Sequence, residues 1–389
     1  MVILYYLNQT KSGIMSTEKI RELDNLVGEH FQPDFWARMQ GKLLYRADEE
    51  AVQPEEIERI TTALKNRGLY PYVEKRNGEY LLFVPPESQK HERSKIWLNT
   101  LLFLATIFTT MFIGASLSGK DIFEDFSLIL FGWRYSFAVL TILTAHEMGH
   151  YVAARLHKIR VTLPYYLPLP LPGFHLGTLG AFIRLKSQIP NRKALLDVGV
   201  AGPLAGIIVS LIFLILGYAT LPNFEGIVAY VETIHPWDMQ GGVNIILGKS
   251  LLFSFFNDFI GNGRLPMNEV YHFPFIFAGW IGILVTAINL IPIGQLDGGH
   301  ILYSLIGKKA RNVGLISFFA LFILNIYLLV EFLSAIWLLW IILILILIRF
   351  RHPPTLNDHI ELTPMRRFLG WLCLFIFAIC FIPMPLHIQ

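Results

Sequence analysis

Residues 136–156, SFAVLTILTAHEMGHYVAARL, place three ionisable side chains at the end of an apolar run. His146, Glu147 and His150 lie in the last half of a segment that is long enough to cross a bilayer. A charged residue at membrane depth costs about 2.5–3.5 kcal/mol on insertion scales. A cluster of this kind therefore needs an interaction that offsets its burial.

The composition of the chain is that of an integral membrane protein. Of 389 residues, 54% are hydrophobic and only 16% are charged, which is too apolar for a soluble enzyme of this length. The formal net charge of +3 is too small to indicate a nucleic-acid partner. Both cysteines, Cys373 and Cys380, lie in the last apolar stretch, so any metal site must use histidine and carboxylate ligands.

Apolar runs of about 20 residues predict a soluble head followed by roughly seven transmembrane helices. The predicted spans are residues 96–116, 133–156, 195–218, 273–291, 315–330, 333–350 and 368–383. The inside segments carry many Lys and Arg residues, whereas the outside loops hold only Lys120, Arg134, Lys249 and Arg264. By the positive-inside rule, the head and the HEMGH end of the second span are cytoplasmic. We expect a multi-pass protein of a prokaryotic cell membrane, with its active site near the cytoplasmic face.

Residues 17–86 predict a small cytosolic α/β domain with a β-α-β-β pattern. GKLLY at 41–45 is a predicted strand, and residues 53–68 form a predicted amphipathic helix. Residues 70–84 predict a hairpin that turns at Asn77-Gly78. No catalytic pattern stands out in this head.

His146 and His150 are placed to hold one metal ion. On a helix they are four residues and about 40° apart, so both imidazoles project from one face. Glu147 is turned by about 100° and can reach a metal-bound water without being a ligand. In this H-E-x-x-H arrangement zinc lowers the pKa of bound water towards ~7, and the glutamate accepts its proton. The alternative, a helix end with unrelated histidines, leaves the burial of the cluster without compensation.

Asp297 is the best candidate for a third ligand, since a catalytic zinc usually has three protein ligands and an open fourth position. It lies in INLIPIGQLDGGH, residues 288–300, which follows the fourth span and reaches the same membrane face as HEMGH. Pro292 interrupts helical hydrogen bonding there, which is tolerated where the backbone lines a cavity. Taken alone, Asp297 would be read as a helix cap. Two weaker candidates are His175, in a loop, and Asp197, which we expect to cap the third span.

The two motifs, in this order and topology, resemble the site-2 protease family of intramembrane zinc metalloproteases. HEMGH fits the family's H-E-x-x-H pattern, and NLIPIGQLDG, residues 289–298, fits N-x-x-P-x-x-x-L-D-G. GTLGAFIRLKS and NRKALLDVGVAGPLAG, between the motifs, are similar to the chloroplast and cyanobacterial branch. The resemblance covers about residues 95–311, a membrane metalloprotease core, and leaves residues 312–389 as additional C-terminal transmembrane helices.

The resemblance implies a role for each motif residue. His146, His150 and Asp297 would be the Zn²⁺ ligands, and Glu147 would be the general base. Asn289 would contact the substrate backbone or the developing oxyanion. The implied reaction is hydrolysis of peptide bonds in or near transmembrane segments of membrane proteins, as in regulated intramembrane proteolysis. The substrate partner is therefore a protein within the lipid bilayer, and neither its identity nor an oligomeric state is indicated.

Residues 163–188, LPYYLPLPLPGFHLGTLGAFIRLKSQ, are first rich in proline and then alternate in side-chain polarity as a β-strand does. They therefore cannot form a spanning helix. They resemble the family's membrane-associated β-hairpin. A helical substrate must unwind before hydrolysis, and an exposed strand at 181–185 could capture the extended backbone by strand addition. The candidate substrate-binding residues are Gly180, Ala181, Phe182 and Ile183. A plain cytosolic hairpin without substrate contact is an equal alternative.

A second class of function stays open at this point. In a polytopic metal transporter, or a metal-binding membrane scaffold, the same residues would hold a passing ion. The position of Glu147, which suits a base, argues against it, as does the lack of further ionisable residues that could form a path.

Overall fold

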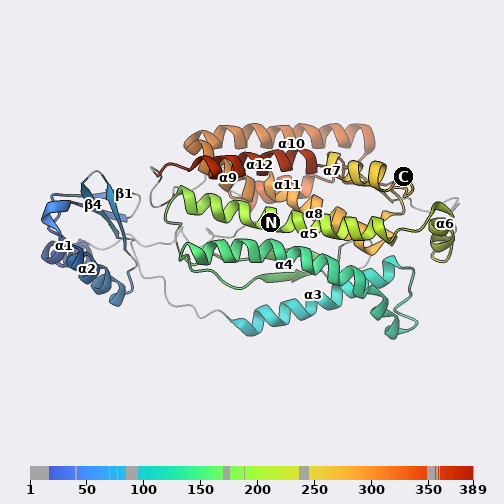
Figure 1. Cartoon of the computed structure of the whole chain (residues 1–389), viewed down its shortest axis with the longest axis horizontal. Helices are drawn as coiled ribbons and strands as arrows, with labels where there is room; N and C mark the ends of the chain where they lie inside the picture. The colour runs from blue at the N-terminus through green and yellow to red at the C-terminus, as the bar shows by residue number, and fades with distance from the viewer. Residues whose placement is uncertain are drawn as a thin grey trace. The chain divides into compact units, whose positions relative to one another are not determined.

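The structure, a computed structural model, describes residues 17–39, 42–69, 71–76, 78–84, 95–169, 176–187, 189–235, 245–347, 355, 358 and 360–388. The described chain falls into two compact units. One lies within residues 4–94 and 186–190, and the other within residues 95–185 and 191–389. Figure 1 draws both with the labels used below.

The smaller unit combines an antiparallel sheet with two helices in one core. Its elements are α1 (Thr17–Phe31), β1 (Phe35–Met39), β2 (Lys42–Asp48), η2 (Glu49–Ala51), α2 (Pro54–Asn66), β3 (Tyr72–Arg76) and β4 (Glu79–Val84). The strand order is β1-β2-β4-β3, and each neighbouring pair is antiparallel. Leu23, Val27 and Phe31 recur every four residues along α1, as Ile60 and Leu64 do along α2, and all five are buried.

The predicted β-α-β-β pattern corresponds to β2, α2, β3 and β4. Gly78, with a φ of +81°, stands in the turn between β3 and β4, whereas Asn77 lies outside the described residues. The sequence did not predict α1 and β1. In β1, Phe35 and Trp36 are adjacent and both exposed, so the strand lacks the alternation that marks a half-buried strand.

The larger unit is built mainly of helices. The α-helices are α3 (Ile96–Leu117), α4 (Trp133–Leu156), α5 (Arg192–Ala219), α6 (Phe224–Glu232), α7 (Leu251–Ser254), α8 (Pro274–Leu290), α9 (Asp297–Ile306), α10 (Ala310–Phe332), α11 (Leu338–Leu347) and α12 (Pro364–Cys380). Shorter helical turns are η3 (Phe126–Gly132), the π-helical η4 (Phe255–Ile260), η5 (Val270–His272) and η6 (Gly307–Lys309). The strands are β5 (Tyr165–Pro168), β6 (Thr178–Phe182), β7 (Ile245–Leu247) and β8 (Leu386–Ile388).

Within the described residues, four helical stretches are long and apolar enough to cross a membrane. They are Ile96–Leu117, Phe126–Leu156, Arg192–Ala219 and Asp297–Phe332. Each of the seven predicted spans coincides with a helix, but α8 has 17 residues, α11 has 10 and α12 has 17, fewer than the ~20 that a full crossing needs. The count of seven spans therefore stays a prediction.

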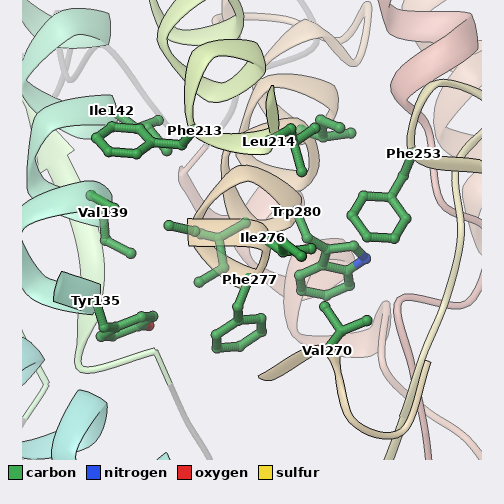
Figure 2. Close-up of a cluster of buried hydrophobic side chains, with 14 of the residues drawn as sticks. Tyr135, Val139, Ile142, Phe213, Leu214, Phe253, Val270, Ile276, Phe277 and Trp280 are labelled. Atoms are coloured by element: carbon green, nitrogen blue, oxygen red, sulfur yellow. The ribbon is translucent and has the colours of Figure 1, made fainter. Parts of the chain in front are cut away.

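Helices α4, α5 and α8 pack around one apolar core, which Figure 2 shows in close-up. The buried side chains that it labels on these helices are Tyr135, Val139 and Ile142 of α4, Phe213 and Leu214 of α5, and Ile276, Phe277 and Trp280 of α8. The α4 members follow the i, i+4, i+7 spacing of one helix face. This core precedes HEMGH along α4 and precedes Asn289 along α8, so it holds the helices that present the site.

The proline-rich stretch contains an antiparallel hairpin of β5 and β6. Tyr165 pairs with Phe182 and Tyr166 with Ala181, and the register shifts before Pro168 pairs with Thr178. In the described part of the larger unit, β6 has β5 as its strand partner. Among the described residues, no strand pairs with the other edge of β6.

The prediction of a strand over residues 181–185 was wrong in its bounds. Strand β6 ends at Phe182, and Leu185 forms an isolated bridge with Val161. The ladder stops after Phe182 because Pro164 cannot donate a hydrogen bond and because the carbonyl oxygens of Leu163 and Pro164 accept from the Asn99 side chain instead. His175, the weaker ligand candidate in this stretch, lies outside the described residues.

Asp197 joins three helices, so the expectation that it caps one was wrong. The cap of α5 is Asn191, whose side chain accepts the amide of Ala194. Asp197 lies one turn and a half further on, where its carboxylate accepts from Arg366 of α12 at 2.8 and 2.9 Å. It also contacts His157 Nε2, just after α4, at 2.8 Å.

Candidate metal centre

The five motif residues come together from three helices. His146, Glu147 and His150 lie on α4, Asn289 lies near the end of α8, and Asp297 is the first residue of α9. None of them is more than 2% exposed. Residues almost 150 positions apart in sequence therefore meet in one buried site, as the motif spacing and the predicted topology required.

Three ligand atoms form a nearly equilateral triangle. His146 Nε2 and His150 Nε2 are 3.1 Å apart, and Asp297 Oδ2 lies 3.3 Å from the first and 3.2 Å from the second. Tetrahedral zinc with bonds of about 2.0–2.1 Å separates its ligand atoms by about 3.3 Å. The three side chains thus have the spacing, and the two-nitrogen, one-oxygen donor set, that a zinc ion requires.

Several polar atoms at the site lack a hydrogen-bond partner. Four buried oxygen atoms have no hydrogen-bond partner in the described part of the chain: both carboxylate oxygens of Asp297, Oε2 of Glu147 and Oδ1 of Asn289. Such atoms are costly unless a cation or a polar molecule satisfies them. The fit to a metal and its polar ligands therefore rests on unsatisfied acceptors as well as on distances.

The imidazoles are oriented by groups outside the triangle. His150 Nδ1 lies 2.7 Å from the carbonyl oxygen of Val198 on α5, so this nitrogen donates and Nε2 presents its lone pair to the site. The Asn289 amide nitrogen lies 3.3 Å from His146 Nε2. Glu147 Oε1 lies 3.9 Å from the same nitrogen, outside hydrogen-bond distance, so Glu147 borders the triangle without belonging to it.

Two glycines of α5 leave room for the two imidazoles, and we did not predict this role for them. A methyl group on Gly202 would lie 2.1 Å from His150 Nε2, and one on Gly206 would lie 3.0 Å from His146 Nδ1. A methyl group on Gly149 of α4 would lie 2.4 Å from the Ala201 carbonyl, which shows how closely the helices approach. The sequence signal was the matched four-residue spacing of the glycines and of the histidines. AGPLAG, residues 201–206, had suggested only close helix packing.

Asp297 is positioned by a tight connection between α8 and α9. Helix α8 ends at Leu290, two residues before Pro292. A methyl group on Gly298 would lie 2.0 Å from the Leu290 carbonyl oxygen, and one on Gly299 would lie 2.4 Å from the Gly294 carbonyl oxygen. The glycines therefore allow the backbone to fold back, which brings the carboxylate under the α4 histidines.

The four candidate substrate-binding residues lie along β6 and just beyond it. Ala181 and Ile183 are fully buried, whereas Gly180 and Phe182 are half-buried. The backbone amide of Ile183 interacts with the Glu147 carboxylate, so the chain passes directly beside the motif here. Truncation of the Ile183 side chain would leave a cavity, which makes this residue a poor probe of substrate contact.

Comparisons with known proteins point to one family. Residues 134–328 match the model described as Peptidase family M50. The chain is 28% identical over 304 residues to "Probable zinc metalloprotease EGY2, chloroplastic" of Oryza sativa subsp. indica, covering 73% of this chain and 52% of that protein. It is 31% identical over 250 residues to the EGY1 protein of Oryza sativa subsp. japonica, covering 64% and 40%. The chain spans about half the length of these curated relatives, and no solved structure matches it.

We predict that Gly202→Ala displaces the His150 imidazole and lowers zinc affinity by about tenfold or more, the usual effect of disturbing a ligand's support. Gly206→Ala, with its longer contact to His146, should have a smaller effect. Competition with a chromophoric chelator measures both affinities. Gly28→Ala, at a position with open space on α1, is the matched control. Equal zinc affinity in Gly202→Ala and Gly28→Ala would contradict the role of Gly202.

Proposed function

The chain belongs to peptidase family M50, and from this membership and its buried metal centre we propose that it is an intramembrane zinc metalloprotease. It hydrolyses peptide bonds in or near transmembrane segments of membrane proteins. The observation that carries the proposal is the triangle of His146, His150 and Asp297 with Glu147 beside it. His146, His150 and Asp297 would hold the zinc ion, which when bound acts as a Lewis acid and makes water more acidic.

Glu147 is proposed as the general base. Its Oε2 is buried without a hydrogen-bond partner in the described structure, so it is ready to accept a proton from the attacking water. The Ile183 amide, which interacts with the same carboxylate, orients it. A base held this way need not move before proton transfer.

Asn289 is proposed as the group that receives the substrate carbonyl. Its amide nitrogen lies 3.3 Å from His146 Nε2, so the N–H donors of this fully buried side chain face the three candidate ligands. A preorganised amide donor at this position can stabilise negative charge that develops on the carbonyl oxygen.

We further propose that the edge of β6 away from β5 binds the unwound substrate. Strand addition satisfies the backbone groups of an extended peptide in a water-poor site. Because Ile183, just past β6, meets Glu147, a peptide added to this edge would run past the base. Gly180, Ala181, Phe182 and Ile183 would supply the backbone contacts.

The transporter alternative gains no support. Figure 2 shows apolar side chains of α4, α5 and α8 packed against one another, and on α4 and α8 they come from the turns that precede HEMGH and Asn289. An ion that crosses the membrane needs polar groups along its path. Family membership likewise favours a peptidase.

The chain is an integral membrane protein, since it combines four apolar helices of spanning length with membership of a membrane-protein family. The finer orientation, with the head and the active site on the cytoplasmic face, is a proposal that rests on the distribution of Lys and Arg. The word "chloroplastic" in the names of the relatives does not support a prokaryotic cell membrane.

The first test concerns the base. Glu147→Gln should retain zinc and lower the cleavage rate of a generic transmembrane substrate by about 10²-fold or more, because it removes proton acceptance and keeps both imidazoles. Turnover in detergent and metal analysis of the same sample give both readouts. Glu225→Gln, at an exposed position of α6, is the control. Unchanged turnover in Glu147→Gln would sink the proposed mechanism.

The second test concerns β6. A photo-crosslinker at Leu179, which is 64% exposed on β6, should capture substrate trapped by Glu147→Gln protein. The control position is Ile316 on α10, which is 69% exposed and outside the hairpin. If crosslinkers at Phe182 and Leu179 both fail while one near Asn289 succeeds, the hairpin is structural only.

The third test concerns orientation. Lys308 and Glu225 are exposed, and single cysteines at these positions report on the two opposite sides of the membrane in the proposed orientation. The native Cys373 and Cys380 are buried, so they should add little labelling of their own. In intact bacterial cells that express the chain, an impermeant maleimide should label Glu225→Cys and spare Lys308→Cys. The reverse pattern would overturn the proposed orientation.

A further inference from the structure

A second group of metal-ligating side chains lies at the other end of α8. His235 follows α6, and Glu269 and His272 lie at η5, just before α8 begins. His272 precedes Asn289 by 17 residues, nearly all of them in α8, which corresponds to about 25 Å at 1.5 Å per residue. The group is therefore separate from the HEMGH centre.

The ligand atoms of this group form a triangle like that of the first centre. His235 Nε2 lies 3.0 Å from His272 Nε2, and Glu269 Oε2 lies 3.4 Å from the former and 3.6 Å from the latter. These separations bracket the ~3.3 Å between ligands of a tetrahedral zinc ion. Two imidazole nitrogens and one carboxylate oxygen also match the preference of zinc.

Two of the three candidate ligand atoms have a lone pair that faces the triangle. His272 Nδ1 meets the carbonyl oxygen of Leu117, so this nitrogen carries the proton and Nε2 is an acceptor, as in His150. Glu269 Oε1 accepts from the Asn268 amide, whereas Oε2 is buried without a hydrogen-bond partner in the described structure. The Glu269 and His272 side chains are only 3% and 4% exposed.

Glu269 Oε2 is a buried carboxylate oxygen without a hydrogen-bond partner in the described structure. Such an atom is costly to bury unless a cation satisfies it.

We propose that His235, Glu269 and His272 bind a second divalent ion of the zinc type at the end of the membrane unit opposite HEMGH. The ion joins the residue that follows α6 to the turn that begins α8. Through the Leu117 carbonyl it also supports the end of α3. Because the ion would tie together segments at the ends of α6, α8 and α3, its role in this proposal is structural.

The experiment counts the zinc ions bound by the wild-type chain and by the Asp297→Ala chain, each with and without His235→Ala. His235 is the most exposed ligand, so its loss is the least disruptive to folding. Each protein is loaded with zinc, freed of excess ion and analysed for metal. His235→Ala should remove one equivalent from the wild-type chain and one from the Asp297→Ala chain, independently of what the first centre binds. His387→Ala, outside both triangles, should remove none.

Thermal unfolding is a second measurement, which distinguishes the loss of a zinc site from a variant that fails to fold. Zinc should raise the thermal unfolding temperature of Asp297→Ala protein, and His235→Ala or Glu269→Gln should abolish that rise. An unchanged zinc count on His235→Ala in both backgrounds would overturn the proposal, because the cluster would then be an ordinary His–Glu ion pair. An unchanged zinc-dependent rise in Glu269→Gln would overturn it as well.

Discussion

The burial of two imidazoles and two carboxylates among apolar helices is the constraint on which the membrane unit depends. Such groups are costly in a low-dielectric interior unless a cation and positioned dipoles compensate them. The close approach of α4 and α5 at Gly149 and Gly202 makes that compensation possible, because it brings the Val198 carbonyl to His150. The apolar core in Figure 2 then fixes α8, whose end carries Asn289.

Local spacing in the sequence predicted much of this site. The i, i+4 separation of His146 and His150 requires a shared helix face, and the structure has them on α4 with Nε2 atoms 3.1 Å apart. Asp297 followed from topology, since two spans that end at one membrane face bring their ends together. Apolar run length placed the helices, although it does not distinguish a full crossing from a shorter buried helix such as α8.

Features that depend on contacts between distant segments were missed or misread. Asp197 was expected to cap a helix, but its partner Arg366 lies 169 residues away. The end of β6 is set opposite Pro164, whose carbonyl oxygen accepts from Asn99 of α3, 65 residues away. His235 and His272 are 37 residues apart and do not belong to one helix or strand, so no periodicity links them. In each case the sequence contains the residues but not the geometry that brings them together.

The central claim is that one zinc ion is held between α4 and the start of α9 by His146, His150 and Asp297. Zinc-edge anomalous diffraction from crystals of the Glu147→Gln chain tests it most directly. The account predicts an anomalous peak about 2.0–2.2 Å from His146 Nε2, His150 Nε2 and an Asp297 carboxylate oxygen. Zinc-loaded crystals with no peak between these atoms, or a peak that Asp297 does not contact, would contradict it.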